Sequence, residues 1–295
     1  MDAIAPASAG YRWTPILENV PIARYTYRLR LGDRAMARSI MPGQFVMVRP
    51  GSEGATDPLL GRPLALYEVV RDSQRAPNSF DVVYLVVGRG TSALAQRKEG
   101  ERLAVWGPLG NGFGPPPSGS VILVAGGIGQ TPFLALGRSW LGKESYGDQP
   151  AIRRGHSQVT SMSLLYGART AAFLAGLDDF HRAGIEVELA TDDGSAGHHG
   201  FVTELLARRL GQGDRPAKIV GCGPPAMLAA LAMLADQYQV PCDVSLENHM
   251  ACGFGACFSC VAPIRQTDGS TDLRRVCVEG PVVAAKLIDW PRLVH

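Results

Sequence analysis

Short apolar runs alternate with turns over the first hundred or so residues and predict a set of β-strands. The runs are rich in β-branched and aromatic residues and lie at 25–31, 44–48, 64–70 and 80–87. Strands at this regular spacing, with no long helical pattern between them, are typical of a small antiparallel barrel. We therefore predict an N-terminal β-barrel domain over residues 1–115.

From residue 121 the pattern changes to buried apolar strands that are each followed by a helical segment. A run at 121–125 leads into glycines and then into a helix. Three further pairs of strand and helix follow, at 162–167 with 171–183, at 185–190 with 201–210, and at 217–220 with 225–238. This alternation predicts a parallel sheet covered by helices on both faces. We assign this α/β domain to residues 116–241.

A polar stretch at 142–161 separates the first of these helices from the next strand. It holds Lys143, Arg153, Arg154 and His156. We interpret it as a surface insertion whose basic residues form a solvated face.

Four of the six cysteines lie in the last part of the chain and are spaced as metal ligands. Cys252, Cys257 and Cys260 read C-x4-C-x2-C, and Cys277 follows at a distance. This is the spacing of plant-type [2Fe-2S] ligands. Glycines and small residues between the thiols let backbone amides approach the cluster. We predict a small [2Fe-2S] module over residues 242–295.

These cysteines could instead form a structural zinc site or disulfides. A structural zinc site usually shows two separated Cys-x2-Cys pairs, and only Cys257 and Cys260 have that spacing. Disulfides are disfavoured because the thiols lie close together in a chain of intracellular character. Cys242, outside the motif, is expected to be a buried core residue.

Charge and length exclude several classes of function. The chain has 295 residues and a net charge of +2, with no basic excess to favour nucleic acid or anionic lipid. The first residues show no secretory signal, and the most apolar later stretch, 226–235, is too short to span a bilayer. We expect a cytoplasmic protein with two cores and a small appended module.

A glycine-rich loop follows the predicted strand at 121–125. Gly127 and Gly129 allow a pyrophosphate to approach backbone amides at the positive end of a helix, with Thr131 as the expected N-cap and Pro132 in the first turn. A strict dinucleotide fingerprint has glycine or alanine where Pro132 stands. The alternative to a nucleotide-binding loop is a glycine turn that only permits close packing.

Three later segments fall where strands of such a sheet end, and ligands of open α/β sheets bind at that edge. They read Y-G-A-R at 166–169, T-D-D-G at 191–194 and G-C-G-P at 221–224. With the G-G-x-G-x-x-P loop, in this order, they resemble the ferredoxin-reductase superfamily. The resemblance implies that the first loop binds a nicotinamide dinucleotide and that the barrel binds flavin. It places Arg169 and Asp192 near the adenosine half, and Cys222, Gly223 and Pro224 beside the nicotinamide.

Two short motifs in the predicted barrel resemble the flavin motifs of that superfamily, R-x-Y/P-S and G-x-x-S/T. The first is the run Arg62-Pro63-Leu64-Ala65, and the second lies within 88–92. The resemblance implies that Arg62 hydrogen-bonds the flavin or its phosphate. It also implies that Gly90 and Thr91 offer backbone amides to the pyrophosphate, where a short helix is predicted over 92–96.

The barrel departs from the superfamily pattern at two positions, which leaves flavin identity and tightness of binding open. Ala65 stands in place of the usual serine. In Val83-Tyr84-Leu85, which we also assign to the flavin site, Leu85 stands where an arginine often follows the tyrosine. An isolated Arg-Pro pair also suits an ordinary turn at a strand edge, but the order and spacing of the motifs favour the flavin.

The C-terminal third narrows the resemblance. The segments 246–257 and 274–282, together with 107–113 and 90–92, resemble the electron-transfer subunit of class 1B dihydroorotate dehydrogenase, and the likeness runs from 11 to 290. The resemblance implies a partner subunit that contains FMN and oxidises dihydroorotate in pyrimidine biosynthesis. Electrons would then pass through the cluster and FAD to NAD+, in a heterotetramer of two of each subunit.

The chemistry also points to FAD, because only a flavin readily connects hydride transfer with one-electron transfer. No catalytic acid or base for dihydroorotate is expected here. We predict a preference for NADH over NADPH, and an apolar face at Met250, Phe254 and Phe258 that contacts the partner.

Three alternatives stay open. Two are redox proteins, namely a flavin and iron–sulfur subunit of a sulfide dehydrogenase or ferredoxin-NAD(P) reductase, and a stand-alone oxygenase reductase. The third is a non-catalytic zinc or redox-sensing module.

Overall fold

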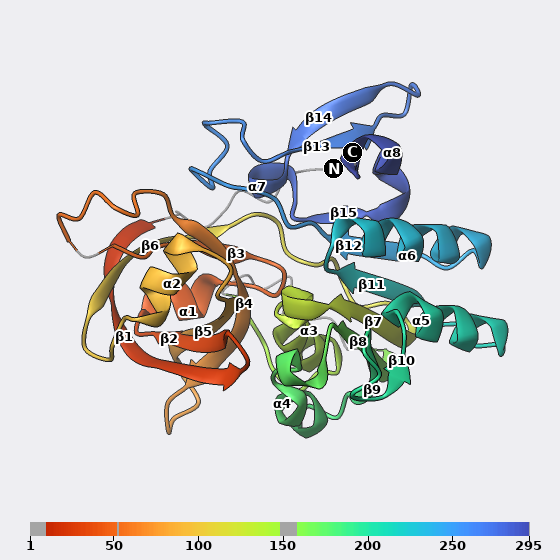
Figure 1. Cartoon of the computed structure of the whole chain (residues 1–295), viewed down its shortest axis with the longest axis horizontal. Coiled ribbons are helices and arrows are strands. Elements are labelled where there is room, and N and C mark those ends of the chain that lie inside the picture. The colour runs from red at the N-terminus through yellow and green to blue at the C-terminus, as the bar shows by residue number, and fades with distance from the viewer. Residues whose placement is uncertain (1–9, 52, 148–157, 295) are drawn as a thin grey trace.

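The computed structural model describes residues 10–51, 53–147 and 158–294 and shows three parts that follow one another along the chain (Figure 1). A barrel is followed by an α/β unit and then by a small segment that returns to the sheet. This confirms the predicted fold class. Arg153, Arg154 and His156 of the predicted insertion lie outside the described residues.

The barrel contains six antiparallel strands in the closed order β1-β2-β5-β4-β3-β6. They are β1 (Gly10–Ala23), β2 (Thr26–Leu31), β3 (Phe45–Arg49), β4 (Arg62–Arg71), β5 (Pro77–Leu85) and β6 (Arg102–Leu109), with the short helices α1 (Arg34–Ser39) and α2 (Arg89–Ala95). Strands β1 and β6 pair with each other and were missed by the sequence pattern, because β1 lacks regular alternation and contains Pro15 and Pro21.

The second sheet has the order β10-β9-β8-β7-β11-β12-β15, and it is parallel except for β15. Its strands are β7 (Gly119–Gly126), β8 (Val159–Ala168), β9 (Glu186–Thr191), β10 (His198–His199), β11 (Lys218–Cys222), β12 (Cys242–Ser245) and β15 (Val282–Ala284). The helices around it are α3 (Phe133–Trp140), α4 (Leu177–Arg182), α5 (Val202–Gly211) and α6 (Pro225–Gln237).

Helices cover both faces of this sheet, as predicted. Val121 and Leu123 of β7 pack in one buried cluster with Phe180 of α4, whereas Ile122 and Val124 pack in another with Leu205 of α5. Alternate residues of one strand therefore enter two cores, as expected for a strand buried on both sides.

Two local predictions for this unit were wrong. Thr131 does not cap α3, because Gly127–Gln130 forms a 3₁₀ turn, η1, and Pro132 occupies the N-cap position. The helix predicted over 171–183 is divided into η2 (Ala171–Phe173) and α4, with Gly176 in a left-handed conformation between them. Lys143 is exposed, as predicted for the insertion, and its Nζ also donates to the carbonyl of Ala183 at 2.6 Å.

The C-terminal segment leaves the sheet after β12 and comes back to it at β15. It contains the hairpin β13 (Val261–Arg265) and β14 (Thr271–Arg275), then α7 (Val276–Glu279), η3 (Ala285–Leu287) and α8 (Trp290–Leu293). Cys242 opens β12 and is only partly buried against the core. The boundaries at 115/116 and 241/242 stay predictions, and both β12 and β15 belong to the larger sheet.

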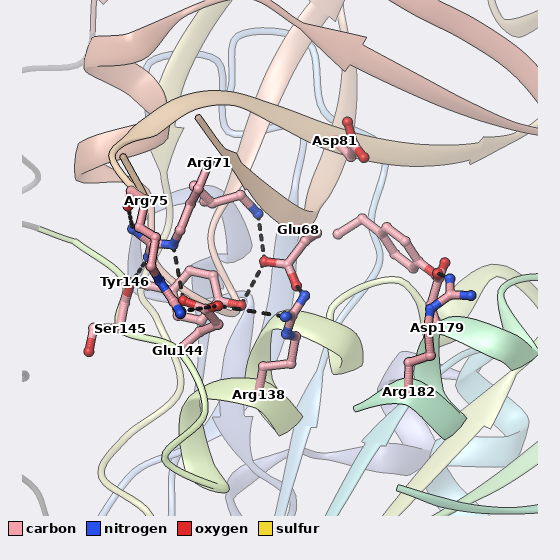
Figure 2. Close-up of polar contacts among 12 residues, drawn as sticks. Glu68, Arg71, Arg75, Asp81, Arg138, Glu144, Ser145, Tyr146, Asp179 and Arg182 are labelled. Atoms are coloured by element: carbon pink, nitrogen blue, oxygen red, sulfur yellow. Dashed lines mark hydrogen bonds and ion pairs between the residues drawn. The ribbon is translucent and has the colours of Figure 1, made fainter. Parts of the chain in front are cut away.

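A polar network joins the barrel to the α/β unit (Figure 2). Glu68 of β4 accepts hydrogen bonds from Arg138 Nη1 of α3 at 2.8 Å and from the Tyr146 hydroxyl at 2.7 Å. Next to it, the hydroxyl of Tyr67 donates to Asp179 at 2.7 Å. These contacts hold the two units together on the side of the sheet that α3 and α4 cover. Among the described residues, no helix is long and apolar enough to cross a membrane.

Candidate cofactor sites

The predicted flavin residues lie where β4 changes its partner strand. Residues 62–65 pair with β3, and from Leu66 onward β4 pairs with β5, beginning at Leu66↔Val82. The two strands therefore separate beside 83–85, and their backbone groups there are not matched to each other. The end of β5 at this point also approaches η1 of the α/β unit. A flavin placed here would lie between the barrel and the first loop of the sheet.

Arg62 lies over the start of α2. A Cβ atom added to Gly90 would clash with its guanidinium, so a larger residue there would displace Arg62 from this position. Arg62 Nη1 also donates to the carbonyls of Leu60 at 2.9 Å and Gly61 at 3.2 Å. A guanidinium beside the first amides of a helix suits a diphosphate.

The neighbouring polar groups of the predicted flavin loop are engaged within the protein. The Thr91 hydroxyl accepts from the amides of Val87 at 2.9 Å and Gly88 at 3.2 Å, so it closes the start of α2. Arg89 forms an ion pair with Asp57. The predicted contact with a flavin diphosphate therefore depends on the backbone amides of Gly90 and Thr91, not on the Thr91 hydroxyl.

The side chains of Val83 and Tyr84 are both buried, on opposite faces of β5: Tyr84 packs in the barrel core, and Val83 packs in the core shared with β7 and α4. They are 2% and 1% exposed, and the Tyr84 hydroxyl donates to Asn19 at 3.0 Å. Burial raises the pKa of Tyr84. Any contact of these two residues with a flavin is therefore made by main-chain atoms, while Leu85 is half-buried at the end of the strand.

The predicted nucleotide loops meet at the carboxyl edge of the sheet. A Cβ atom on Gly129 would collide with the carbonyl of Cys222, so η1 packs directly on the turn after β11. Gly127 opens η1, Gly223 continues the turn, and Pro224 is the exposed N-cap of α6. The structure thus brings the first glycine loop and the G-C-G-P turn together, as a dinucleotide site requires.

Glu247 reaches this turn from the C-terminal segment. Its Oε1 lies 3.9 Å from Sγ of Cys222, which is 3% exposed. Burial, followed by the negative charge of Glu247, raises the pKa of the Cys222 thiol well above its usual range. Sequence reasoning used Glu247 only as part of a family pattern, and no local signal indicated this contact.

Arg169 and Asp192 lie in two loops that are bonded to each other at the ends of β8 and β9. Asp192 N donates to the carbonyl of Ala168 at 3.1 Å, and Asp193 N donates to that of Arg169 at 3.3 Å. The side chains of Arg169 and Asp192 are exposed. Hydrogen bonds from Ser195 lower the pKa of Asp193, which keeps this carboxylate charged.

The four cysteines of the C-terminal motif approach one another in two pairs. The amide of Cys277 donates to Sγ of Cys260 at 3.4 Å, and both residues are buried. Burial, with a further effect of Cys260, raises the pKa of Cys277 to about 12. Hydrogen bonds from Ser259 and then from Cys252 lower the pKa of Cys257 to about 6.

Two thiols for each of two irons is the ligand arrangement that a [2Fe-2S] cluster needs, so the donor set fits. Within residues 10–51, 53–147 and 158–294, no three His, Cys, Asp or Glu side chains gather around one point as ligands of a single ion.

The apolar face expected beside these cysteines is present in part. Phe254 is 61% exposed and Phe258 is 60% exposed. The Arg275 guanidinium lies 5.0 Å from the centre of the Phe258 ring. Met250, in contrast, is half-buried and packs partly against the core, so it contributes less to this face than the two phenylalanines do.

Comparison with known proteins identifies an iron-sulfur domain and an NAD-binding domain in the chain. A family model described as the iron-sulfur cluster binding domain of dihydroorotate dehydrogenase B matches residues 247–289, and one described as an oxidoreductase NAD-binding domain matches 123–232. The electron transfer subunit of dihydroorotate dehydrogenase B (NAD(+)) from Desulforamulus reducens is 36% identical over 91% of this chain and 94% of its own length. The subunit of the same name from Fusobacterium nucleatum is 34% identical over 92% and 96%. The chain belongs to this family of electron transfer subunits.

Solved structures extend the comparison to the fold. A structure described as NADH-dependent reduced ferredoxin-NADP oxidoreductase, studied for flavin-based electron bifurcation, has a TM-score of 0.77 and 26% identity, and covers 97% of this chain and 92% of its own. A ferredoxin reductase of carbazole 1,9a-dioxygenase shares the fold, with a TM-score of 0.62 and 22% identity over 81% of this chain and 68% of its own. The predicted cofactor set of FAD, a [2Fe-2S] cluster and NAD is confirmed at the level of family and fold.

Proposed function

We propose that this chain is the NAD+-reducing subunit of a dihydroorotate dehydrogenase. A partner subunit oxidises dihydroorotate to orotate, and the two electrons reach NAD+ through the cluster and FAD of this chain. Dihydroorotate and NAD+ are then converted to orotate, NADH and a proton. The bound flavin supplies the conversion between single electrons and a hydride.

One observation carries this proposal. The segment between β12 and Cys252 contacts both other sites, because Glu247 lies against the nicotinamide turn at Cys222 and the carbonyl of Cys252 accepts a hydrogen bond from Trp106 of the barrel. The proposed sites for a cluster, a flavin and a nucleotide would therefore lie around one short stretch of chain. This arrangement suits transfer of electrons along a line of adjacent cofactors.

Each group of residues has a holding role in this scheme. We assign Cys252 and Cys257 to one iron, and Cys260 and Cys277 to the other. Arg62 and the first amides of α2 hold the flavin diphosphate, and η1 holds the nucleotide diphosphate. The buried Cys222 thiol has a raised pKa and stays protonated, and its turn would hold the nicotinamide end of the nucleotide.

The partner is proposed to contain FMN and to form a heterotetramer of two copies of each subunit. The described residues form an antiparallel barrel and an open α/β sheet, and neither is the β/α barrel of about 250 residues that we expect in the partner. Exposed Phe254 and Phe258, beside the cluster ligands, provide an apolar surface that suits a stable contact with that partner. A cytoplasmic location and the absence of nucleic-acid or membrane partners stay predictions.

Co-expression with an FMN-containing dihydroorotate dehydrogenase tests the proposal. The two chains should purify together, and the complex should reduce NAD+ with dihydroorotate while neither chain does so alone. A chain that binds no such subunit, or a complex that oxidises dihydroorotate without reducing NAD+, would contradict it.

A second candidate is a ferredoxin-NAD(P) reductase subunit, because the solved structure with a TM-score of 0.77 carries that description. Reduction of NAD+ or NADP+ by reduced ferredoxin, in the absence of any dihydroorotate-oxidising subunit, would favour this alternative.

We further propose that the nucleotide is NADH. The carboxylates of Asp192 and Asp193 lie in the loop after β9 and would repel a 2′-phosphate, although Arg169 could attract one. We expect kcat/KM for NADH to exceed that for NADPH by about tenfold, the size of one unfavourable charge contact of about 1.4 kcal/mol. Asp192→Asn should narrow the ratio, and a tenfold advantage for NADPH in the unmodified chain would refute the proposal.

A further inference from the structure

One side chain of the barrel touches both the cluster loop and the flavin strand. Trp106, on β6, donates from its indole Nε1 to the carbonyl of Cys252 at 2.8 Å. The two residues are 146 positions apart in the sequence. The hydrogen bond therefore attaches the first cysteine of the cluster motif directly to the barrel wall.

The other end of the same indole lies against the strand that carries the flavin motif. A Cβ atom on Gly61 would lie 2.5 Å from Cη2 of Trp106 and 3.2 Å from Cε of Met47. Gly61 immediately precedes Arg62, whose guanidinium lies over Gly90 at the start of α2. A continuous line of contacts thus leads from Cys252 through Trp106 to the proposed flavin diphosphate site.

The cluster loop is packed onto the barrel without intervening space. A Cβ atom on Gly253 would lie 2.5 Å from Cγ of Met47 and 3.0 Å from Cδ1 of Leu109. Glycine in this left-handed conformation lets the loop sit on the floor formed by β3 and β6. The distance between loop and barrel is then set by side-chain contact.

The other end of the cluster segment is also attached to the barrel. Asn111, just after β6, donates from Nδ2 to the carbonyl of Val282 at 2.8 Å and accepts from the amide of Val282 at 2.9 Å. Residues on β6 and just after it therefore contact the cluster segment at its first cysteine and shortly after its last one. Of Trp106 and Asn111, it is Trp106 that also contacts Gly61 at the start of the flavin strand.

We propose that Trp106 is a positioning residue for electron transfer, and that it fixes the separation between the cluster and the flavin. This inference rests on the proposed function. In each transfer the cluster loses one electron and the flavin gains one, or the reverse, and no bond forms or breaks. Trp106 is neither oxidised nor reduced, and it acts by holding the Cys252 end of the loop against Gly61.

Trp106→Phe tests the inference because it keeps a ring at Gly61 and removes the N–H donor. Amides at 251–254 should lose about fivefold of their protection from hydrogen exchange, the equivalent of one neutral hydrogen bond. The cluster should be reduced by NADH about fivefold more slowly and give an altered reduced-state EPR spectrum, whereas reduction of the flavin by NADH stays unchanged. Trp13→Phe is the matched control, since Trp13 lies on the same barrel and contacts Arg49 instead.

A measurement on the unmodified chain tests the inference even if the Trp106→Phe variant does not fold. The indole N–H resonance of Trp106 should exchange slowly with solvent, and exchange as fast as that of an exposed indole would overturn the inference. Equal exchange protection, EPR spectra and cluster reduction in Trp106→Phe and Trp13→Phe would overturn it too. A wild-type chain without iron, or with a cluster that NADH does not reduce, would instead overturn the proposed function.

Discussion

The barrel meets its two neighbours in different ways. Toward the α/β unit it presents buried charge: Glu68 is 8% exposed and bonded to Arg138 and Tyr146 (Figure 2). Toward the cluster loop it presents Met47, Leu109 and the indole of Trp106, with one neutral hydrogen bond. The barrel is thus joined to the α/β unit by buried ion pairs, and to the cluster loop mainly by apolar packing.

The difference predicts how separable the parts are. A buried carboxylate whose partner is removed is left unpaired at high cost, so the barrel and the α/β unit should depend on each other for stability. Loss of the cluster, in contrast, removes no charge partner from the barrel. The cluster side should therefore tolerate changes that leave the flavin in place.

The largest effect is expected from Cys257→Ser. The variant should lose the cluster completely and keep its flavin, because the ligands lie outside the barrel. Iron content, the visible spectrum and EPR of the reduced protein would measure this, with Cys242→Ser as control since Cys242 lies in β12. If two irons remain with an unchanged EPR signal, the ligand assignment is wrong.

Phe254→Asp changes the outer face of the cluster loop, which the barrel does not cover. We expect weaker assembly with the partner and a loss of dihydroorotate:NAD+ activity, while NADH still reduces artificial acceptors through the flavin. An exposed aromatic at the centre of an interface contributes about 2 kcal/mol or more, or roughly thirtyfold in affinity.

The control for this face is Phe201→Asp, which alters a side chain of similar exposure, 65%, just before α5. Loss of both activities together with unfolding would show that Phe254 serves the core of the loop. Unchanged assembly would place the interface elsewhere.

Arg138→Gln should destabilise the junction of the barrel with the α/β unit. The side chain of Arg138 is 36% exposed, so we discount the cost of a fully buried pair to about 1–3 kcal/mol in the free energy of unfolding. Urea denaturation would measure it. Arg182→Gln, which removes an exposed partner of Asp179, should change stability by less than about 0.5 kcal/mol. Equal effects of the two variants would show that the Arg138–Glu68 pair stabilises the junction no more than an exposed ion pair does, and would contradict this account.

The smallest expected effect concerns pH. Burial raises the pKa of Glu68 above 4.5 despite its bonds to Tyr146 and Arg138, so the folded state holds this proton more tightly than the unfolded state. Its contribution to stability is therefore greatest at low pH and declines as the pH rises through the raised pKa. Glu68→Gln should flatten the pH dependence of Tm in that acidic window. A Tm difference between the two proteins that does not vary with pH would count against this account.

The parts of this architecture that the sequence predicts are those with a local signal. Alternating strands, glycine loops and the cysteine spacing each depend on neighbours within about ten residues, and most were found. The contacts of Trp106 with Cys252 and of Glu247 with Cys222 depend on residues far apart in the chain, so no periodicity marks them. The N-cap at Thr131 failed because the chain makes a 3₁₀ turn first. Val83 and Tyr84 were assigned to the flavin site by motif order, yet the Tyr84 side chain completes the barrel core and the Val83 side chain packs toward the α/β unit.

The most direct test of the account is a single-turnover experiment on the complex with the dihydroorotate-oxidising partner. Dihydroorotate is mixed anaerobically with the complex in the presence of NAD+, and the cluster, the flavins and NADH are followed together. We predict that NADH forms with the wild-type chain, and that with Cys257→Ser only the flavin of the partner is reduced. Formation of NADH at the same rate without the cluster would contradict the proposed route of the electrons.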